Sequence, residues 1–177
     1  MSVVEVRFHG RGGQSYLAFP RLLGEAALLD GLYAQVYASF GTIRPGMPSY
    51  AGVRIDRAFI RTRSTNASLP DHVVVLDNSL LLVDDVTSGL RPGGTVLVGK
   101  GIGVAELKEK VGSDFKIHLL EVGEEVPALA RQVAVLAEIN RVIGLISPQA
   151  LFQLVDSRVP AEERPACHAE IEKRISG

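Results

Sequence analysis

Apolar positions in the first part of the chain alternate between strand-like runs and a helical period. Residues 3–8 form a short apolar run, which predicts a first strand ending near His9. Apolar residues then recur at spacings of three and four, which predicts a helix that the Asp-Gly pair at 30–31 ends. Pro20 falls inside this helix, so we expect either a kink there or a late helix start.

The pattern after this helix predicts further strands. Residues 33–40, YAQVYASF, predict a second strand, and residues 41–49 a loop with two glycines and two prolines. The stretches AGVRIDR and AFIRTR, residues 51–63, predict a two-stranded excursion that turns near Arg57-Ala58.

The second half of the chain repeats a strand-then-helix pattern. The run HVVVLD, residues 72–77, is apolar on both faces, which is typical of a buried parallel strand. The elements expected after it are a short helix at 79–86, a strand at 95–99, a helix at 105–111, a strand at 115–122 and a helix within 124–144. This series predicts an α/β fold with a doubly wound, mostly parallel sheet and helices on both faces.

Length and the C-terminal pattern indicate the domain organisation. A chain of 177 residues fits one hydrophobic core. We expect residues 1–146 to form the domain. Residues 147–177 would form a helical C-terminal extension, starting near Pro148, that packs on the domain or on a partner chain.

Composition excludes several classes of protein. An apolar content of 46% with 22% charged residues is typical of soluble globular proteins and excludes disordered and fibrous ones. No apolar stretch reaches the roughly 18 residues that span a membrane, and Glu5 and Arg7 interrupt the region where a signal peptide would be apolar. We therefore expect a cytoplasmic protein. Cys167 is the only cysteine, so the chain alone forms no internal disulfide and no iron–sulfur site.

The net charge of −1 hides an uneven distribution. Residues 1–63 carry eight arginines, no lysine and four acidic residues, whereas the remainder is acidic. Guanidinium groups suit bidentate contacts with phosphate, carboxylate or the acidic side chains of a partner. Solvated surface arginines are an equal alternative. The balanced charge and the lack of a basic run with aromatic residues make nucleic acid a poor candidate.

A glycine-rich segment directly after the first predicted strand is the strongest candidate site. It consists of Gly10, Arg11, Gly12, Gly13, Gln14 and Ser15. In an α/β sheet such a turn exposes backbone N–H groups at a helix N-terminus, where anions bind. Arg11 would add a positive charge, and Gln14 and Ser15 would donate hydrogen bonds or cap the helix. The segment matches neither GxGxxG nor a P-loop, and a tight turn that needs glycine is the alternative.

The other reactive side chains form no complete catalytic set. Asp84-Asp85 could do acid–base work but more simply faces solvent at a helix end. The serines lack the GxSxG context of a nucleophile. The histidines have no partner at helical spacing, which favours packing or surface roles for His72, His118 and His168. His9 is the exception that stays open, because it lies at a strand end beside the glycine-rich segment.

The order of motifs resembles a known protein family. The segments VEVRFHGRGGQS, SFGTIRPGMPSYAGVRID, LPDHVVVLDNSLL and DVTSGLRPGGTVLVG follow one another between about residues 3 and 100. Their order is similar to that in the gamma subunit of the 2-oxoacid:ferredoxin oxidoreductases, which include pyruvate:ferredoxin oxidoreductase. The glycine-rich segment, followed about thirty residues later by the loop with Arg44, is the specific pair.

The resemblance implies an enzyme of several subunits that oxidatively decarboxylates a 2-oxoacid to an acyl-coenzyme A. Electrons would pass to ferredoxin or a related acceptor. It implies thiamine diphosphate and Mg with the alpha and beta subunits, 4Fe-4S clusters in partners such as a ferredoxin-like delta subunit, and coenzyme A as co-substrate. This chain would be a Rossmann-like module that holds none of these cofactors itself. The residues facing the shared catalytic interface would be Gly10, Arg11, Gly12, Gly13, Gln14, Ser15 and Arg44.

Three positions depart from the pattern of the family. Ser15 stands where the family usually has glycine, Arg44 precedes Pro45 instead of a second arginine, and Gly99 replaces a common asparagine. These differences leave the 2-oxoacid open, from pyruvate to an aromatic one such as phenylglyoxylate. Two other functions stay open: a purely structural assembly subunit without ligand contact, and a free-standing mononucleotide-binding protein of flavodoxin-like architecture.

Overall fold

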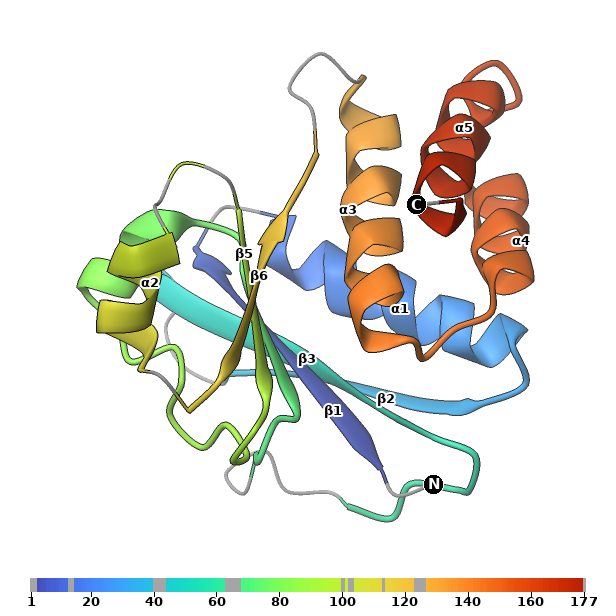
Figure 1. Ribbon diagram of the computed structural model, residues 1–177. Helices are drawn as coiled ribbons and strands as arrows, with labels where there is room; N and C mark the ends of the chain where they lie inside the picture. Colours follow the sequence, from blue (N-terminus) through green and yellow to red (C-terminus); the bar gives the residue numbers. More distant parts are fainter. Residues whose placement is uncertain are drawn as a thin grey trace.

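The computed structural model describes residues 3–12, 15–39, 44–62, 68–99, 101, 104–112, 114–122 and 127–176. A six-stranded sheet carries helices on both faces (Figure 1). The elements are β1 (Val4–Arg11), η1 (Ser15–Leu17), α1 (Ala18–Leu29), β2 (Tyr33–Ala38), β3 (Pro48–Asp56), β4 (His72–Val75), η2 (Asn78–Leu82), β5 (Thr95–Gly99), α2 (Val104–Val111), β6 (Lys116–Leu120), α3 (Ala128–Ile143), α4 (Pro148–Arg158) and α5 (Arg164–Ile175). The predicted α/β fold is confirmed.

The strands lie in the order β2-β3-β1-β4-β5-β6. β1, β4, β5 and β6 are parallel to one another, whereas β3 is antiparallel to both of its neighbours, β1 and β2. Only β3 therefore runs against the direction of the other described strands. This arrangement confirms the mostly parallel sheet.

The two-stranded excursion expected at residues 51–63 is wrong. Residues 48–56 form one long strand, β3, and the described residues after it, 57–62, contain no strand. β3 is paired with β1 on one edge and with β2 on the other, so neither edge is free for a hairpin partner. Residues 57–62 therefore cannot form a hairpin with β3.

Of the two alternatives predicted for Pro20, a kinked helix or a late helix start, the structure shows the late start. A short 3₁₀ turn, η1, precedes α1, which begins at Ala18. Pro20 is thus in the first turn of α1, where a backbone N–H has no intrahelical partner. Its missing N–H therefore removes no helical hydrogen bond.

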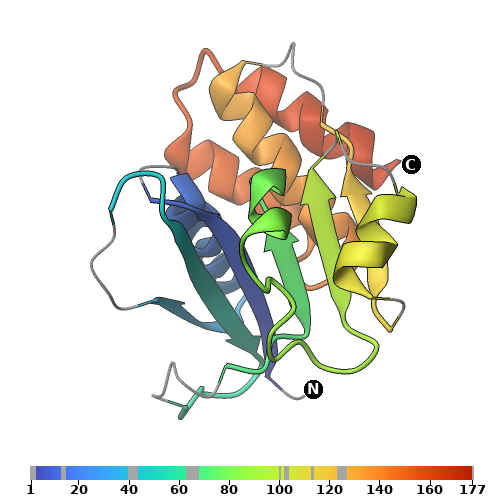
Figure 2. The same ribbon diagram turned by 90° about the vertical axis from the view of Figure 1, so that its left-hand side faces the viewer.

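The sheet separates two hydrophobic cores. On one face, Val6 and Phe8 of β1 pack with α1, α3, α4 and α5; on the other, Val73 and Val75 of β4 pack with η2 and α2. In Figure 2, η2 and α2 lie in front of the sheet and the other helices behind it. In that view the near face of β1 and β3 carries no helix within the described chain.

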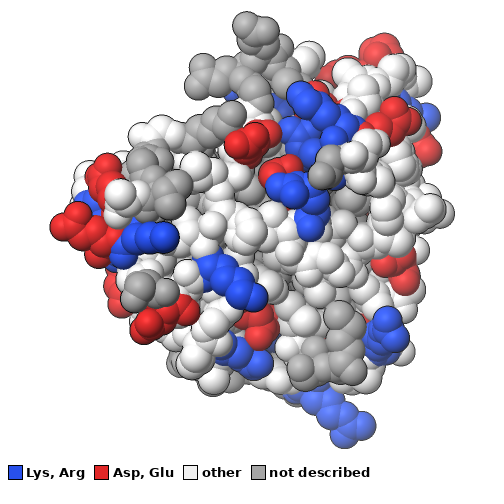
Figure 3. Space-filling view, in the orientation of Figure 1, with Lys and Arg blue, Asp and Glu red and all other residues white. Residues whose placement is uncertain are grey.

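The C-terminal helices pack on the same core as α1 and α3. Ser147 caps α4 and also donates its backbone N–H to Asp30 at 2.9 Å, which ties α4 to the end of α1. On α5, Arg174 lies between Glu138 of α3 and Glu170. Figure 3 shows basic and acidic side chains intermixed over α3 and α5. The domain boundary at residue 146 stays a prediction.

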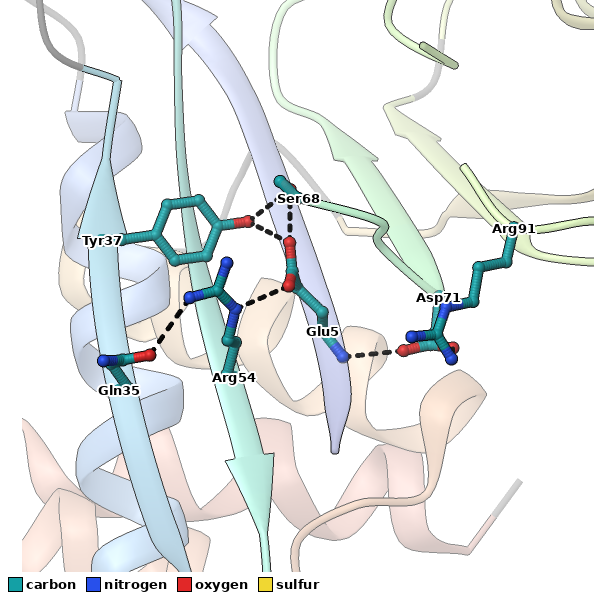
Figure 4. A network of polar contacts seen from close by, with 7 residues as sticks. All are labelled: Glu5, Gln35, Tyr37, Arg54, Ser68, Asp71 and Arg91. Atoms are coloured by element: carbon teal, nitrogen blue, oxygen red, sulfur yellow. Dashed lines mark hydrogen bonds and ion pairs between the residues drawn. The ribbon is translucent and has the colours of Figure 1, made fainter. Parts of the chain in front are cut away.

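The helix-free face of β1, β3 and β2 buries a polar network (Figure 4). Glu5 accepts hydrogen bonds from Arg54 at 2.7 Å, from Tyr37 at 2.6 Å and from Ser68. Burial alone would raise the pKa of Glu5, but the hydrogen bonds from Ser68, Tyr37 and Arg54 outweigh it and lower the pKa. The backbone N–H of Glu5 donates to Asp71 at 2.8 Å. The network therefore holds residues 68–71 against the sheet.

Gly52 makes this network possible, and its replacement tests the packing. A β-carbon at position 52 would overlap the ring of Tyr37, whose hydroxyl is held by Glu5. We expect Gly52→Ala to lower the free energy of unfolding by about 1–3 kcal/mol in urea denaturation, since overpacking forces side chains off their rotamers. Gly99→Ala is the control because its β-carbon would meet only Asn78, at 3.5 Å. Equal stability of the two variants would contradict the prediction.

Candidate functional site

The glycine-rich segment lies where the chain changes from one face of the sheet to the other. After β1 the chain continues into α1, on the face of Val6 and Phe8. After β4 it continues into η2, whose Leu80 packs on the opposite face. β1 and β4 are neighbours, so their carboxyl ends form the switch point at which open α/β sheets bind ligands.

Arg11, at the end of β1, joins three segments at this edge of the sheet. Its Nε lies 3.2 Å from Asp77 Oδ2 and 3.0 Å from Ser79 Oγ, and its Nη2 donates to Ser79 Oγ at 2.6 Å. Its Nη1 donates to the backbone oxygen of Gly46 at 2.8 Å. The guanidinium therefore fixes the end of β1 to the start of η2 and to the loop before β3.

The loop with Arg44 is bonded directly to the glycine-rich segment. Gly12 donates its backbone N–H to Met47 at 2.8 Å and accepts from that of Gly46 at 2.8 Å. Gly46 has a φ of +80°, which glycine adopts without strain. The side chain of Arg44 is exposed. The structure thus places the loop with Arg44 in direct contact with Gly12, although the two are about thirty residues apart in the sequence.

Not every predicted site residue is described. Gly10 and Arg11 end β1, paired with β3, and Gly12 follows them. Gly13 and Gln14 lie outside the described residues, as does the side chain of Ser15, whose backbone begins η1. Leu17 occupies the cap position of α1, so of the two roles considered for Ser15, hydrogen-bond donor or helix cap, the structure excludes the cap of α1. The short 3₁₀ turn before α1 moved the helix start by three residues.

Three residues after β4 were missed by the sequence analysis. Asp77 caps η2 by accepting from the backbone N–H of Ser79 at 3.0 Å and from its hydroxyl at 2.5 Å. Asn78 donates its side-chain amide to the backbone oxygen of Gly99 at 3.0 Å, which links the ends of β4 and β5. The signal was present, because Asp-x-Ser after a buried strand is a capping pattern.

The two polar residues that precede Arg11 on its face of β1 also contact the chain after η2. Arg7 Nη2 donates to the backbone oxygens of Val86 at 3.0 Å and Ser88 at 2.6 Å. His9 Nδ1 lies 3.4 Å from Asp84 Oδ2. We call residues 77–88 the η2 segment. Side chains 7, 9 and 11 of one strand therefore hold this whole segment over the sheet.

A cavity of about 470 Å³ lies between β1 and the η2 segment. Its lining includes Arg7, His9, Tyr50, Asp84 and Asp85. Burial lowers the pKa of His9 to about 4, with the charge of Arg7 acting in the same direction and Asp84 opposing it. His9 is therefore neutral at pH 7.

The described residues contain no cluster that could hold a metal ion and no membrane-spanning helix. Among those residues, no group of three or more histidine, cysteine or acidic side chains could hold a metal ion. No described helix is both long enough and apolar enough to cross a membrane. Cys167 is buried in α5, far along the chain from the switch point.

The sequence matches one protein family over most of its length. Residues 5–169 match the family described as pyruvate ferredoxin/flavodoxin oxidoreductase. The chain is 35% identical to pyruvate synthase subunit PorC of Methanothermobacter thermautotrophicus, over 97% of both chains. It is 36% identical to the common subunit gamma of the pyruvate/ketoisovalerate oxidoreductases of Pyrococcus furiosus, over 90% of this chain and 89% of that one.

A solved structure shares the fold over nearly the whole chain. The crystal structure of pyruvate oxidoreductase subunit PORC from Thermotoga maritima superposes with a TM-score of 0.80. The match covers 99% of this chain and 97% of that one, with 26% sequence identity. The C-terminal helices are thus included in the similarity.

The buried neutral His9 makes the stability of the chain depend on pH. Its pKa is about 4 in the folded chain, against an ordinary 6.5. Between these two pKa values the unfolded chain binds more protons than the folded chain. The contribution of neutral His9 to the free energy of unfolding is therefore complete above pH 6.5 and is lost as the pH falls toward 4. We expect His9 to account for a loss on the order of 2 kcal/mol.

Urea denaturation at pH 7 and pH 4.5 measures this loss. His9→Gln removes the titrating group, so its free energy of unfolding should fall less between the two pH values than that of the wild type. The exposed His118 provides the control His118→Gln, which should keep the wild-type difference. An equal fall in wild type and His9→Gln would refute the assignment.

Proposed function

The chain belongs to the pyruvate ferredoxin/flavodoxin oxidoreductase family, and we propose that it is the gamma subunit of a cytoplasmic 2-oxoacid:acceptor oxidoreductase complex. The complex would use thiamine diphosphate to decarboxylate a 2-oxoacid oxidatively, form an acyl-coenzyme A and pass electrons to ferredoxin or a related acceptor. The observation that carries this proposal is the near full-length similarity to subunits named for pyruvate synthase and for pyruvate/ketoisovalerate oxidoreductases. The oxidised substrate is therefore a 2-oxoacid.

The role of this chain in the complex is to form one wall of a site shared with its partners. The glycine-rich segment follows from β1 at the switch point, where an open α/β sheet binds its ligand. Arg44, exposed on the neighbouring loop, would attract an anionic group of a ligand or a carboxylate of a partner. Coenzyme A is the co-substrate that we propose to approach this wall.

Arg11 has a positioning role in this proposal. Its guanidinium donates to Asp77, Ser79 and Gly46, so it fixes the position of the loop before β3 relative to the end of β1. Its side chain is 26% exposed, which leaves part of the charge open toward a neighbour. Loss of Arg11 would therefore disturb the loop and reduce the local positive charge at once.

The cofactors of the reaction belong to other subunits. Thiamine diphosphate with Mg supplies the carbanion chemistry, and 4Fe-4S clusters carry the electrons, in the alpha, beta and ferredoxin-like delta subunits. The chemistry of the donors in this chain fits that division, because its single cysteine is buried and a 4Fe-4S cluster requires four thiolates. This chain contributes placement and electrostatics.

One observation favours a second candidate function, a purely structural assembly subunit. The guanidinium of Arg11 bonds Asp77, Ser79 and Gly46, so it serves the internal structure of the loop, as an assembly scaffold without ligand contact would also require. The two candidates differ in kinetics. A scaffold loses assembly when the loop is altered, whereas a wall of the active site changes the saturation curves of the assembled enzyme.

Co-purification tests the complex itself. We expect the tagged full-length chain, isolated without oxygen from its own cells, to bring other subunits with it in a brown fraction that contains thiamine diphosphate. Mass spectrometry and cofactor extraction measure both. A chain that travels alone, or one that is purified with bound flavin, would exclude the proposed function.

Replacement of Arg11 tests the role of the loop in the assembled enzyme. We expect Arg11→Ala to raise the KM for coenzyme A or for the 2-oxoacid roughly tenfold or more, since hydrogen bonds to charged groups contribute about 1.5–3 kcal/mol. Arg21→Ala, which removes an exposed arginine from α1, is the control and should leave both KM values unchanged. Unchanged curves with intact assembly would remove the loop from the active site and favour the structural role.

A further inference from the structure

The end of η2 exposes apolar side chains that the fold does not use. Leu80 and Val86 are buried in the core and anchor the η2 segment at two points. Between them, the side chains of Leu82 and Val83 are 69% and 63% exposed. A single 3₁₀ turn can bury only one side of the continuous apolar run 80–83, so the remainder faces outward. Neighbouring large exposed aliphatic residues mark an interaction site more often than scattered ones do.

Two carboxylates follow these apolar residues and form a ridge between two hollows. Asp84 and Asp85 line both the cavity of about 470 Å³ next to β1 and a second one of about 370 Å³ on the other side. The second hollow is lined by the apolar residues 81–83 and by Lys110. The exposed side chains of Leu82 and Val83 therefore lie directly before two carboxylates that line both hollows.

The η2 segment is held in place from below. Arg7 binds the backbone oxygens of Val86 and Ser88, and Arg11 binds Asp77 and Ser79. Asp85 accepts from the backbone N–H of Thr87 at 3.1 Å and from its hydroxyl at 2.8 Å. A surface fixed in this way loses little conformational entropy when a partner binds to it.

Charge indicates the chemistry of the partner. The nitrogen atoms of His9 and the Nε of Arg7, beneath the ridge, are enclosed, so a partner meets the carboxylates of Asp84 and Asp85 and not these groups. Lys110, which lines the second hollow, is the basic residue on that side. A complementary surface would therefore carry a lysine or arginine for the two carboxylates and an apolar side chain for Leu82 and Val83.

We propose that residues 81–87 of this chain are a docking surface for another subunit of the same complex, which presents a basic side chain next to an apolar one. The inference rests on the proposed function. The η2 segment is bonded to Arg11, so a subunit docked there would also lie beside the glycine-rich segment. Docking and the shape of the shared site would then be mechanically linked.

Two double variants separate the apolar and the ionic contributions. Leu82→Ala with Val83→Ala removes exposed apolar area, and Asp84→Asn with Asp85→Asn removes charge while keeping oxygen acceptors for the turn. Leu28→Ala is the control, because Leu28 is 60% exposed on α1, on the opposite face of the sheet. Thermal unfolding of each full-length chain shows that its fold is kept.

The measurement is the dissociation constant of this chain from the purified complex, obtained by native mass analysis over a dilution series at several salt concentrations. We expect the apolar variant to weaken binding roughly tenfold, as for contacts central to an interface. We expect the charge variant to weaken it at low salt and to flatten the salt dependence. The control should bind like the wild type.

Three outcomes would overturn the inference. Wild-type binding by the apolar and the charge variants would show that partners dock elsewhere, while leaving the proposed function intact. A homodimer of this chain that the apolar variant dissociates would assign the surface to a second copy. A wild-type chain that co-purifies with no other subunit would refute the proposed function together with this inference.

Discussion

The fold depends on the contrast between the apolar and the polar face of β1. Val6 and Phe8 belong to the larger core, whereas Glu5, Arg7, His9 and Arg11 alternate with them on the opposite face, whose part over β1 and β3 carries no described helix. Buried polar groups are costly unless they find partners. Many of the partners come from residues 68–88, a region that forms few regular elements of its own, and the others are Tyr37, Arg54 and Gly46. The polar face of a single strand therefore shapes that region in place of a covering helix.

This arrangement has a consequence for the candidate site. Loops that bind ligands need a rigid support, because a shift of about 1 Å in a positioning group can remove much of the catalytic benefit. Here Arg11 belongs both to the glycine-rich segment and to the support, since it also holds the start of η2. The loop, the ends of β1 and β4 and the η2 segment thus act as one unit. A partner that moves any of them affects the others.

The sequence was sufficient for the elements that repeat a regular period. The buried parallel strands β4 and β5, the amphipathic α3 and the helix starting at Pro148 follow directly from local pattern. The prediction of an extra strand after Arg57 was wrong. Strand pairing depends on which strand edges are free, and both edges of β3 are already paired, which the local alternation of residues does not reveal. For the candidate site, the glycine-rich segment was predictable and the capping pattern of Asp77 and Ser79 was visible. Their contact with Arg11 was not predictable, because they lie more than sixty residues from it in the chain.

The arginine-rich first part of the chain also takes on a different meaning in the folded protein. Arg7, Arg11 and Arg54 are engaged in contacts within the chain, so the positive charge counted from the sequence is not a continuous basic surface. Each of these side chains reaches two or more acceptors, which a planar guanidinium with several fixed donors can do and an ammonium group cannot do as well. Arg54, for example, bonds Glu5 and Gln35 and stacks on Tyr37. Arginine in place of lysine at these positions is therefore explained by the internal demands of a polar sheet face, and the charge available to ligands and partners comes from the exposed arginines, among them Arg44.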